Sequence, residues 1–421
     1  MTLRHHGNFG RFWAAEAVSD VGSYIRLLAL QILIIQNLHG NALDLGLVNA
    51  ARWLPYLLMG LLAGAVLDRV NRRSVLVLTD FLLVLLYAAI GILAYVGYLD
   101  VGWLMGMVFL AGSAALFHEA ASQSYLPELI PSSLLLRANA RLEQTGSLAQ
   151  TIGPAAAGAV IAAIGAPLAV MCDAVAHAGS GVFNSLTNGL RPTRPTERPA
   201  DSRMGHEMRE GLQWLYRHPT LRVLAWNTNL WFLFHSMVIT VLVPFALHQL
   251  GLSPWLLGLV LAGAGLGSFL GTLLSGYFER WCGIGRAISV ARWIYAPSLI
   301  LVVLSPSGAA HAWNAGGFSL VAGGELLYGL AMGIEGPLEM AYRQVITPLR
   351  LQGRINTTMR ATNRTMVVIG SPLGGAMALA FGVRVVLGVA VVGMAAVAVW
   401  YFFSPTYGAE LPAFAPEKDS F

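Results

Sequence analysis

The chain has 421 residues, of which 56% are hydrophobic and only 11% are charged, and its formal net charge is +5. Soluble domains usually carry about 25% charged residues, so this composition excludes an ordinary soluble fold. The only lysine is Lys418, which excludes a phosphate-binding Walker A loop. We expect no nucleic-acid partner, because net charge in a membrane protein mainly reflects topology.

Apolar segments recur along the whole chain, and many reach the roughly 20 residues that a helix needs to cross a membrane. Such segments must be helices, because lipid offers the backbone no hydrogen bonds. In chain order the predicted spans are 12–36, 43–66, 74–97, 102–126, 140–164, 166–188, 222–249, 254–278, 287–306, 316–342, 360–381 and 383–404. The predicted fold is an all-α integral membrane protein with twelve transmembrane helices.

Arginines fix the predicted orientation of these spans. All of them except Arg26, Arg52 and Arg384 fall in or beside connections that lie on one face of a twelve-span protein. Cytoplasmic loops carry the excess of basic residues, so both termini are expected in the cytoplasm. The membrane is expected to be a bacterial inner membrane.

The predicted spans divide into two pseudo-symmetric halves. The N-terminal six-helix half covers 1–188, and the C-terminal six-helix half covers 222–404. Between them, 189–221 is a proline-rich linker followed by an amphipathic helix on the membrane surface, and 405–421 is a cytoplasmic tail.

A glycine, acid and arginine motif follows the second span. Its members are Gly64, Asp68, Arg69, Arg72 and Arg73. This motif resembles the cytoplasmic loop signature of the major facilitator superfamily, and a degenerate copy stands at 276–286, the matching place in the second half. The resemblance implies that these residues control cytoplasmic closure of the two halves, with Asp68 contacting the start of the eleventh span.

The fifth span carries Gly146, Gly153, Pro154 and Gly158. Small residues let helices touch, and proline bends a helix by removing a backbone bond. The set is similar to the glycine and proline motif of antiporter branches of the superfamily; the alternative is a purely structural role. The segment 210–219 resembles the third drug:proton antiporter family, which includes macrolide, siderophore and lysophospholipid carriers.

Ionisable residues inside spans are costly, so each is a candidate for proton coupling or for the substrate cavity. In the first two spans these candidates are Asp20, Glu16, Arg26 and Arg52. Asp20 is expected to exchange a proton for substrate; the alternative is a neutralising pair of Asp20 with Arg26 or Arg52.

Later spans add Glu119, Asp173, His177, Glu325 and Glu335 as candidates. His177 lies one turn after Asp173, which suits either a proton relay or a structural hydrogen bond. The segment 118–122 lacks the second histidine of a zinc-protease motif, so no metal site is predicted.

The combined features predict a monomeric, proton-coupled exporter of amphipathic small molecules that works by alternating access among membrane lipids. An importer, a facilitator or a lysophospholipid flippase of the same fold is the first alternative, and a membrane enzyme or sensor is a remote one. No catalytic motif is recognised and no cofactor is expected, because Cys172 and Cys282 have neither redox nor zinc-ligand spacing.

Overall fold

The computed structural model describes residues 6–67, 70–187, 212–307 and 314–410, and the regular elements within these ranges are helices. The long helices are α1 Gly7–Ile32, α2 Ala42–Leu67, α3 Arg72–Tyr95, α4 Val101–Leu129, α5 Leu135–Ile164, α6 Ala166–Ser185, α8 Pro219–Pro244, α9 Pro254–Cys282, α10 Ile284–Val303, α11 Ala315–Ile346, α12 Leu349–Phe381 and α13 Val383–Phe402. Eleven helices in these ranges are long and apolar enough to cross a membrane. The 26-residue helix α2 is not one of the eleven.

Glycines with positive φ separate the tightest pairs of helices. Gly165 has a φ of 81° between α5 and α6, and Gly382 has a φ of 89° between α12 and α13. Glycine adopts this backbone conformation without a steric penalty, so each helix can end and the next begin within two residues. Both hairpins occur where the sequence predicts them.

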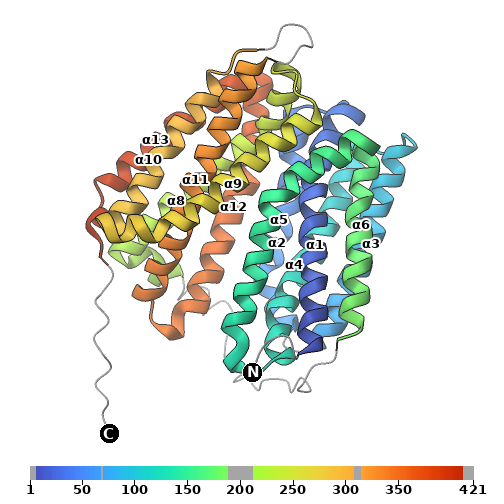
Figure 1. Ribbon diagram of the computed structural model, residues 1–421, viewed down its shortest axis with the longest axis horizontal. Coiled ribbons are helices and arrows are strands. Elements are labelled where there is room, and N and C mark those ends of the chain that lie inside the picture. Colours follow the sequence, from blue (N-terminus) through green and yellow to red (C-terminus); the bar gives the residue numbers. More distant parts are fainter. Residues whose placement is uncertain (1–5, 68–69, 188–211, 308–313, 411–421) are drawn as a thin grey trace.

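The helices form two bundles that stand side by side (Figure 1). In the N-terminal bundle, α1 packs on α5 and α6, α3 packs on α4 and α6, and α2 packs on α4. In the C-terminal bundle, α11 packs on α9 and α10, and α8 packs on α12 and α13. The two bundles also share a local feature: α1 and α8 each continue into a π-helical turn, Leu33–Asn37 and Phe245–Gln249.

Close contacts between the bundles gather away from the end at which α1, α3, α5, α8 and α10 begin. That end, here called the arginine-rich end, carries Arg11, Arg72, Arg73, Arg137, Arg222 and Arg286. At the opposite end α5 packs on α9 and α2 packs on α12. A Cβ atom added to Gly158 of α5 would lie 3.0 Å from the Cα of Gly258 in α9, so small residues permit this approach.

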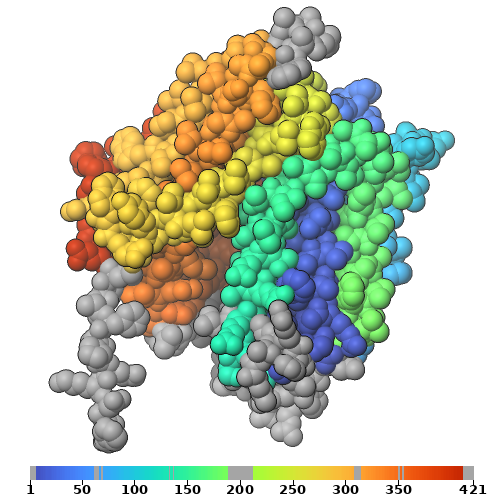
Figure 2. Space-filling view, in the orientation of Figure 1, coloured from blue at the N-terminus to red at the C-terminus, as the bar shows by residue number. Residues whose placement is uncertain are grey.

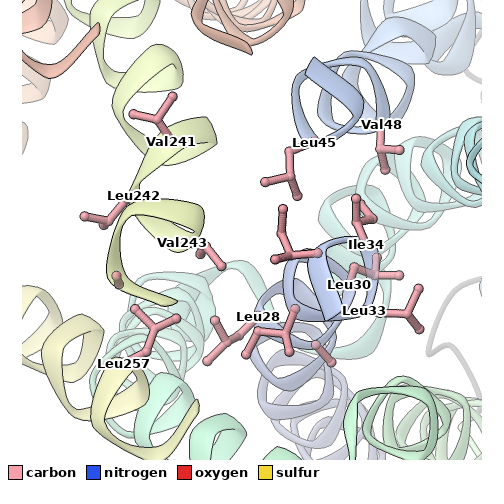
Figure 3. Close-up of a cluster of buried hydrophobic side chains, with 14 of the residues drawn as sticks. Leu28, Leu30, Leu33, Ile34, Leu45, Val48, Val241, Leu242, Val243 and Leu257 are labelled. Atoms are coloured by element: carbon pink, nitrogen blue, oxygen red, sulfur yellow. The ribbon is translucent and has the colours of Figure 1, made fainter. Parts of the chain in front are cut away.

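The surface is hollowed between α5 and α12, in the lower half of Figure 2, toward the arginine-rich end. Above the hollow, buried apolar side chains of α1, α2 and α8 form one cluster where the two bundles meet (Figure 3). The bundles therefore meet around an apolar roof and diverge below it.

Several helices start earlier than the sequence predicts, and three arginines that were expected beside loops lie well inside helices. Helix α12 begins at Leu349, eleven residues before the predicted span, so Arg360 and Arg364 lie well inside the helix and not at its start. Arg292, expected beside a loop, is 2% exposed inside α10. A charged residue lowers the local hydropathy, so a span predicted from hydropathy stops at that residue even where the helix continues. Hydropathy does not take account of partners on other helices that neutralise the charge.

The helical segment 212–217, part of the predicted amphipathic helix, packs its apolar side on the C-terminal bundle. Leu215 is fully buried in an apolar cluster with Leu221, Ile284 and Tyr401. Asn229 donates a hydrogen bond of 2.8 Å to the Tyr216 hydroxyl. The linker before this segment lies outside the described residues.

Candidate functional site

A chain of buried polar side chains runs through the N-terminal bundle. Its members, here called the polar chain, are Glu16, His118, Asp80, His177, Asp173 and Arg26. They come from four helices, α1, α3, α4 and α6, and α1 supplies both ends of the chain. Between Glu16 and Arg26 the chain follows ten residues of α1, which corresponds to about 15 Å of helix.

The strongest ion pair of the polar chain joins α1 to α6. Arg26 Nε donates to Asp173 Oδ2 over 2.5 Å, and the two side chains are 7% and 0% exposed. The Arg26 guanidinium also lies 4.7 Å from the ring centre of Tyr87. The alternative of a neutralising pair between Asp20 and Arg26 is not what the structure shows, because Arg26 pairs with Asp173.

Asp80 is the hub of the polar chain, and it was not among the candidates predicted from the sequence. Its Oδ1 lies 2.9 Å from Nδ1 of His177 and 3.6 Å from Nδ1 of His118. Its Oδ2 accepts hydrogen bonds of 3.1 Å from Ser180 and 3.0 Å from Asn184. Two imidazoles on two helices thus converge on one buried carboxylate.

The remaining links of the polar chain are longer. His177 Nε2 lies 3.9 Å from Asp173 Oδ1, and His118 Nε2 lies 3.8 Å from Glu16 Oε1. Both His118 Nε2 and Asp173 Oδ1 are buried and have no hydrogen-bond partner among the residues that the structure describes. A small rotation or one water molecule at each link would connect the chain from the partly exposed Glu16 to Arg26.

A second buried cluster occupies the C-terminal bundle. Arg292 of α10 lies 2.6 Å from Glu335 and 3.8 Å from Glu339, both on α11, and it donates to Asn227 of α8 over 2.7 Å. Glu339 also accepts from Thr228 over 3.0 Å. Glu335 therefore pairs with Arg292 within a polar cluster that joins three helices of one bundle.

Polar and aromatic side chains of both bundles meet near the middle of α2, α4 and α12. This set, here called the central cluster, contains Arg52, Trp53, Tyr56, Glu119, Arg360 and Arg364. Arg360 of α12 lies 2.8 Å from Glu119 of α4, and these side chains are 50% and 42% exposed. Tyr56 donates to the other oxygen of Glu119 over 3.1 Å.

Two cavities adjoin the central cluster. One is a polar cavity of about 260 Å3 whose lining includes Arg343, Asn356, Arg360, Asn363 and Arg364. The other is a mainly apolar cavity of about 40 Å3 between α1, α2, α4 and α8, and Arg52 lies in its wall. Accessible polar groups thus lie between the two bundles, next to an apolar space.

Two predicted acids stand apart from these networks. Asp20 and Glu325 form no ion pair or hydrogen bond within the described part of the chain. Asp20 lies against α5, since a Cβ atom added to Gly146 would be 3.6 Å from its Oδ2. Glu325 is 6% exposed in α11.

The two glycine-containing motifs lie at helix contacts where the structure describes them. In the fifth-span motif, Gly146 and Gly153 face Asp20 and Tyr24 of α1. Gly158 faces α9, and the carbonyl oxygen of Pro154 would be 2.6 Å from a Cβ atom added to Gly258. This arrangement places α5 between the two bundles.

The loop motif is described only in part. Gly64 lies near the end of α2, whereas Asp68 and Arg69 lie outside the described residues. Arg72 forms an ion pair with Glu128 of α4, and Arg73 donates to the carbonyl of Ser185 in α6. These two arginines tie the start of α3 to the ends of its neighbours.

Paired helical bundles with accessible polar groups between them define a membrane transporter of small molecules. The family described as transmembrane secretion effector matches residues 3–417. The chain belongs to this family of the major facilitator superfamily.

Similar proteins agree with this class. The chain is 26% identical over 386 residues to the multidrug efflux pump Tap of Mycolicibacterium fortuitum, covering 88% of this chain and 89% of the pump. Its fold is similar to the nucleoside transporter NupG, with a TM-score of 0.76, 11% identity and coverage of 96% and 100%. It is also similar to an inward-facing bacterial homologue of the lysosomal transporter Spinster, with a TM-score of 0.73, 15% identity and coverage of 94% and 96%.

Proposed function

We propose that the chain is a proton-coupled exporter of amphipathic small molecules, whose two bundles expose the central cluster alternately to the two sides of the membrane. The family match and the similarity to an efflux pump support the direction and the type of cargo. The accessible polar groups between the bundles support the location of the substrate.

The proposed topology completes the membrane arrangement. Helix α2 is the twelfth span, both termini lie in a bacterial cytoplasm, and the arginine-rich end faces the cytoplasm because cytoplasmic loops carry most basic residues. The N-terminal unit covers 1–188, the linker 189–221, the C-terminal unit 222–404 and the tail 405–421. The protein functions as a monomer in contact with membrane lipids. With this topology, the hollow in Figure 2 corresponds to an inward-facing state.

The polar chain is the observation that carries proton coupling. A series of neighbouring buried acids and histidines can pass a proton from one to the next, because a neutral imidazole has one donating and one accepting nitrogen. Asp80 is the proposed hub, since both imidazoles approach the same carboxylate oxygen. An acid inside the membrane without a neutralising partner is energetically costly, so it is a candidate for function. Asp20 is such an acid, and it is proposed to exchange a proton as α5 moves.

The loop motif is proposed to act on the rate of cycling and not on substrate choice. Arg72 and Arg73 hold the start of α3 against α4 and α6. Asp68→Asn is expected to slow transport while leaving the order of competing substrates unchanged. An unchanged transport rate in this variant would contradict the gating role.

The experiment that tests the proposed function measures drug accumulation in an efflux-deficient bacterial host, with and without a protonophore. The native protein should lower accumulation of some panel compounds, and the protonophore should abolish this effect. Asp80→Asn and Asp20→Asn should abolish it too. Asp100→Asn is the matched control, because Asp100 only caps α4 at an exposed position and asparagine caps equally well.

Two results would contradict the proposal. Lowered accumulation that persists with the protonophore would exclude proton coupling. Unchanged accumulation across the panel, with the protein present in the membrane, would exclude export of such compounds and favour a specific importer or a lipid flippase.

A further inference from the structure

The aromatic ring of Trp53 lies between an arginine from the wall of one cavity and an arginine from the wall of the other. The Arg364 guanidinium of α12 lies 3.7 Å from the ring centre, and the Arg52 guanidinium of α2 lies 4.9 Å from it. Arg364 lines the polar cavity, and Arg52 lines the apolar cavity. A polar cavity in the C-terminal bundle and an apolar cavity toward the roof therefore each have an arginine beside the same aromatic ring.

The charge of this site is not balanced. Arg360 is paired with Glu119, but neither Arg52 nor Arg364 has a carboxylate within 4.0 Å among the described residues. Arg343, which also lines the polar cavity, lies 3.4 Å from Glu339 and is partly neutralised. Three guanidinium groups and one carboxylate leave the central cluster with an excess of two positive charges.

Arginines elsewhere inside the bundles are neutralised. Arg26 pairs with Asp173, and Arg292 pairs with Glu335. Contact with one aromatic ring offsets only about 2 kcal/mol of the cost of a desolvated cation. A structural role would favour an acid beside Arg52 or Arg364, as both bundles provide elsewhere, whereas a binding site for an anion requires the cations to remain free.

The apolar cavity beside Arg52 determines which kind of chemical group the ligand can carry next to its anionic group. Its wall includes Leu30, Ile34, Leu45, Val48, Val108 and Ile239. Figure 3 shows Leu30, Ile34, Leu45 and Val48 converging from α1 and α2. An apolar group placed there would lie directly next to Arg52.

We propose that the transported molecule is an amphipathic anion whose carboxylate or phosphate binds Arg52 and Arg364 beside Trp53, with the adjoining end of its apolar part entering the apolar cavity. This inference rests on the proposed function and narrows its substrate class. Guanidinium groups suit such oxyanions, because their planar donors match carboxylate and phosphate geometry. A bound anion would touch both bundles and would therefore couple occupancy to their relative movement.

Binding of a fluorescent probe, 11-(dansylamino)undecanoate, to the full chain in lipid nanodiscs tests the proposal, with empty nanodiscs as the blank. The neutral methyl ester and an analogue with a terminal amine share the same tail. The acid should bind at least about tenfold more tightly than the ester, as expected when a hydrogen bond to a charged group is gained. Undecyl phosphate should displace the acid, whereas inorganic phosphate at the same concentration should not.

Three variants assign the preference to the site. Arg364→Gln and Arg52→Gln should each remove most of the tenfold preference for the acid, with a much smaller change in ester binding. Arg364→Lys should retain part of it. Arg286→Gln is the matched control, because Arg286 is exposed at the arginine-rich end and contacts Tyr407, away from the site. If Arg364→Gln fails to fold, Arg52→Gln carries the test.

Equal affinity of the native protein for the acid and the ester would overturn the inference, and so would an equal loss in Arg286→Gln. Displacement by inorganic phosphate alone would instead indicate a small-ion site, which also overturns it. Failure of the proposed function is distinguishable: selective acid binding without proton-driven export contradicts export alone. Export of neutral or cationic compounds without acid preference contradicts this inference alone.

Discussion

Replacing Asp173 by asparagine should destabilise the N-terminal bundle strongly. The side chain accepts from Arg26 over 2.5 Å, and both partners are almost completely buried. Removal of one partner of a buried ion pair costs about 3–5 kcal/mol, because the other charge remains buried and unpaired. Asparagine keeps one acceptor oxygen, so we expect the lower end of this range, about 3 kcal/mol, or roughly a hundredfold in the folding equilibrium.

The same chemical change at an exposed ion pair provides the comparison. Glu119→Gln breaks the pair with Arg360, whose partners are about half exposed, and exposed pairs contribute only about 0–1 kcal/mol. Unfolding of each purified variant by a denaturing detergent in mixed micelles, followed by tryptophan fluorescence, gives the free energy differences. The double variant Arg26→Gln/Asp173→Asn should recover part of the loss, because it removes the orphaned charge.

Two outcomes would refute this reasoning. A free energy of unfolding for Asp173→Asn no lower than that for Glu119→Gln would mean that burial does not strengthen the pair. The second outcome is a double variant whose loss of unfolding free energy equals the sum of the losses in the two single variants. That result would mean that Arg26 and Asp173 do not stabilise each other.

Three further predictions concern other parts of the molecule. Gly258→Val should weaken the contact between α5 and α9 by about 1–3 kcal/mol and shift the bundles toward the state closed at the arginine-rich end. Cysteine labelling in the hollow measures this shift. Gly276→Val on the same helix should cause no shift, since nothing lies within 4 Å of a Cβ atom added to Gly276. Arg292→Gln should cost about 3–5 kcal/mol in detergent unfolding, because Glu335 loses its partner; a loss below about 1 kcal/mol would contradict the buried pair. Arg384→Gln should accelerate hydrogen exchange in 303–307, because Arg384 donates to two carbonyls there over 2.7 Å; unchanged exchange would argue against that anchoring role.

The membrane fold is predictable from the sequence because span length and apolarity depend on local composition alone. The hairpins at Gly165 and Gly382 are likewise predictable, since the need for positive φ is local. Arg52 and Glu119 are found as candidates by the cost of charge in a membrane. Their grouping in one cluster is not predictable, because it depends on the rotation of each helix and on how the bundles meet.

Two omissions have identifiable causes. Asp80 lies in an apolar span and satisfies the same criterion of an intramembrane charge as Asp20, so it is predictable from the sequence by that criterion. Arg360 and Arg364, at the start of the predicted span 360–381, were counted with the basic residues beside a cytoplasmic loop, because the orientation rule assigns basic residues near a span end to that loop. Only the start of α12 at Leu349 places them inside the protein.

Proton movement driven by substrate tests the central claim most directly. The purified chain would be reconstituted in proteoliposomes with a trapped pH dye, and a compound that the accumulation assay identifies as exported would be added. We expect this compound to drive protons in the opposite direction in the native protein and in Asp100→Asn. In Asp80→Asn the proton flux should be absent although the compound still binds. Transport of the compound by the native protein without any proton flux would contradict proton-coupled export.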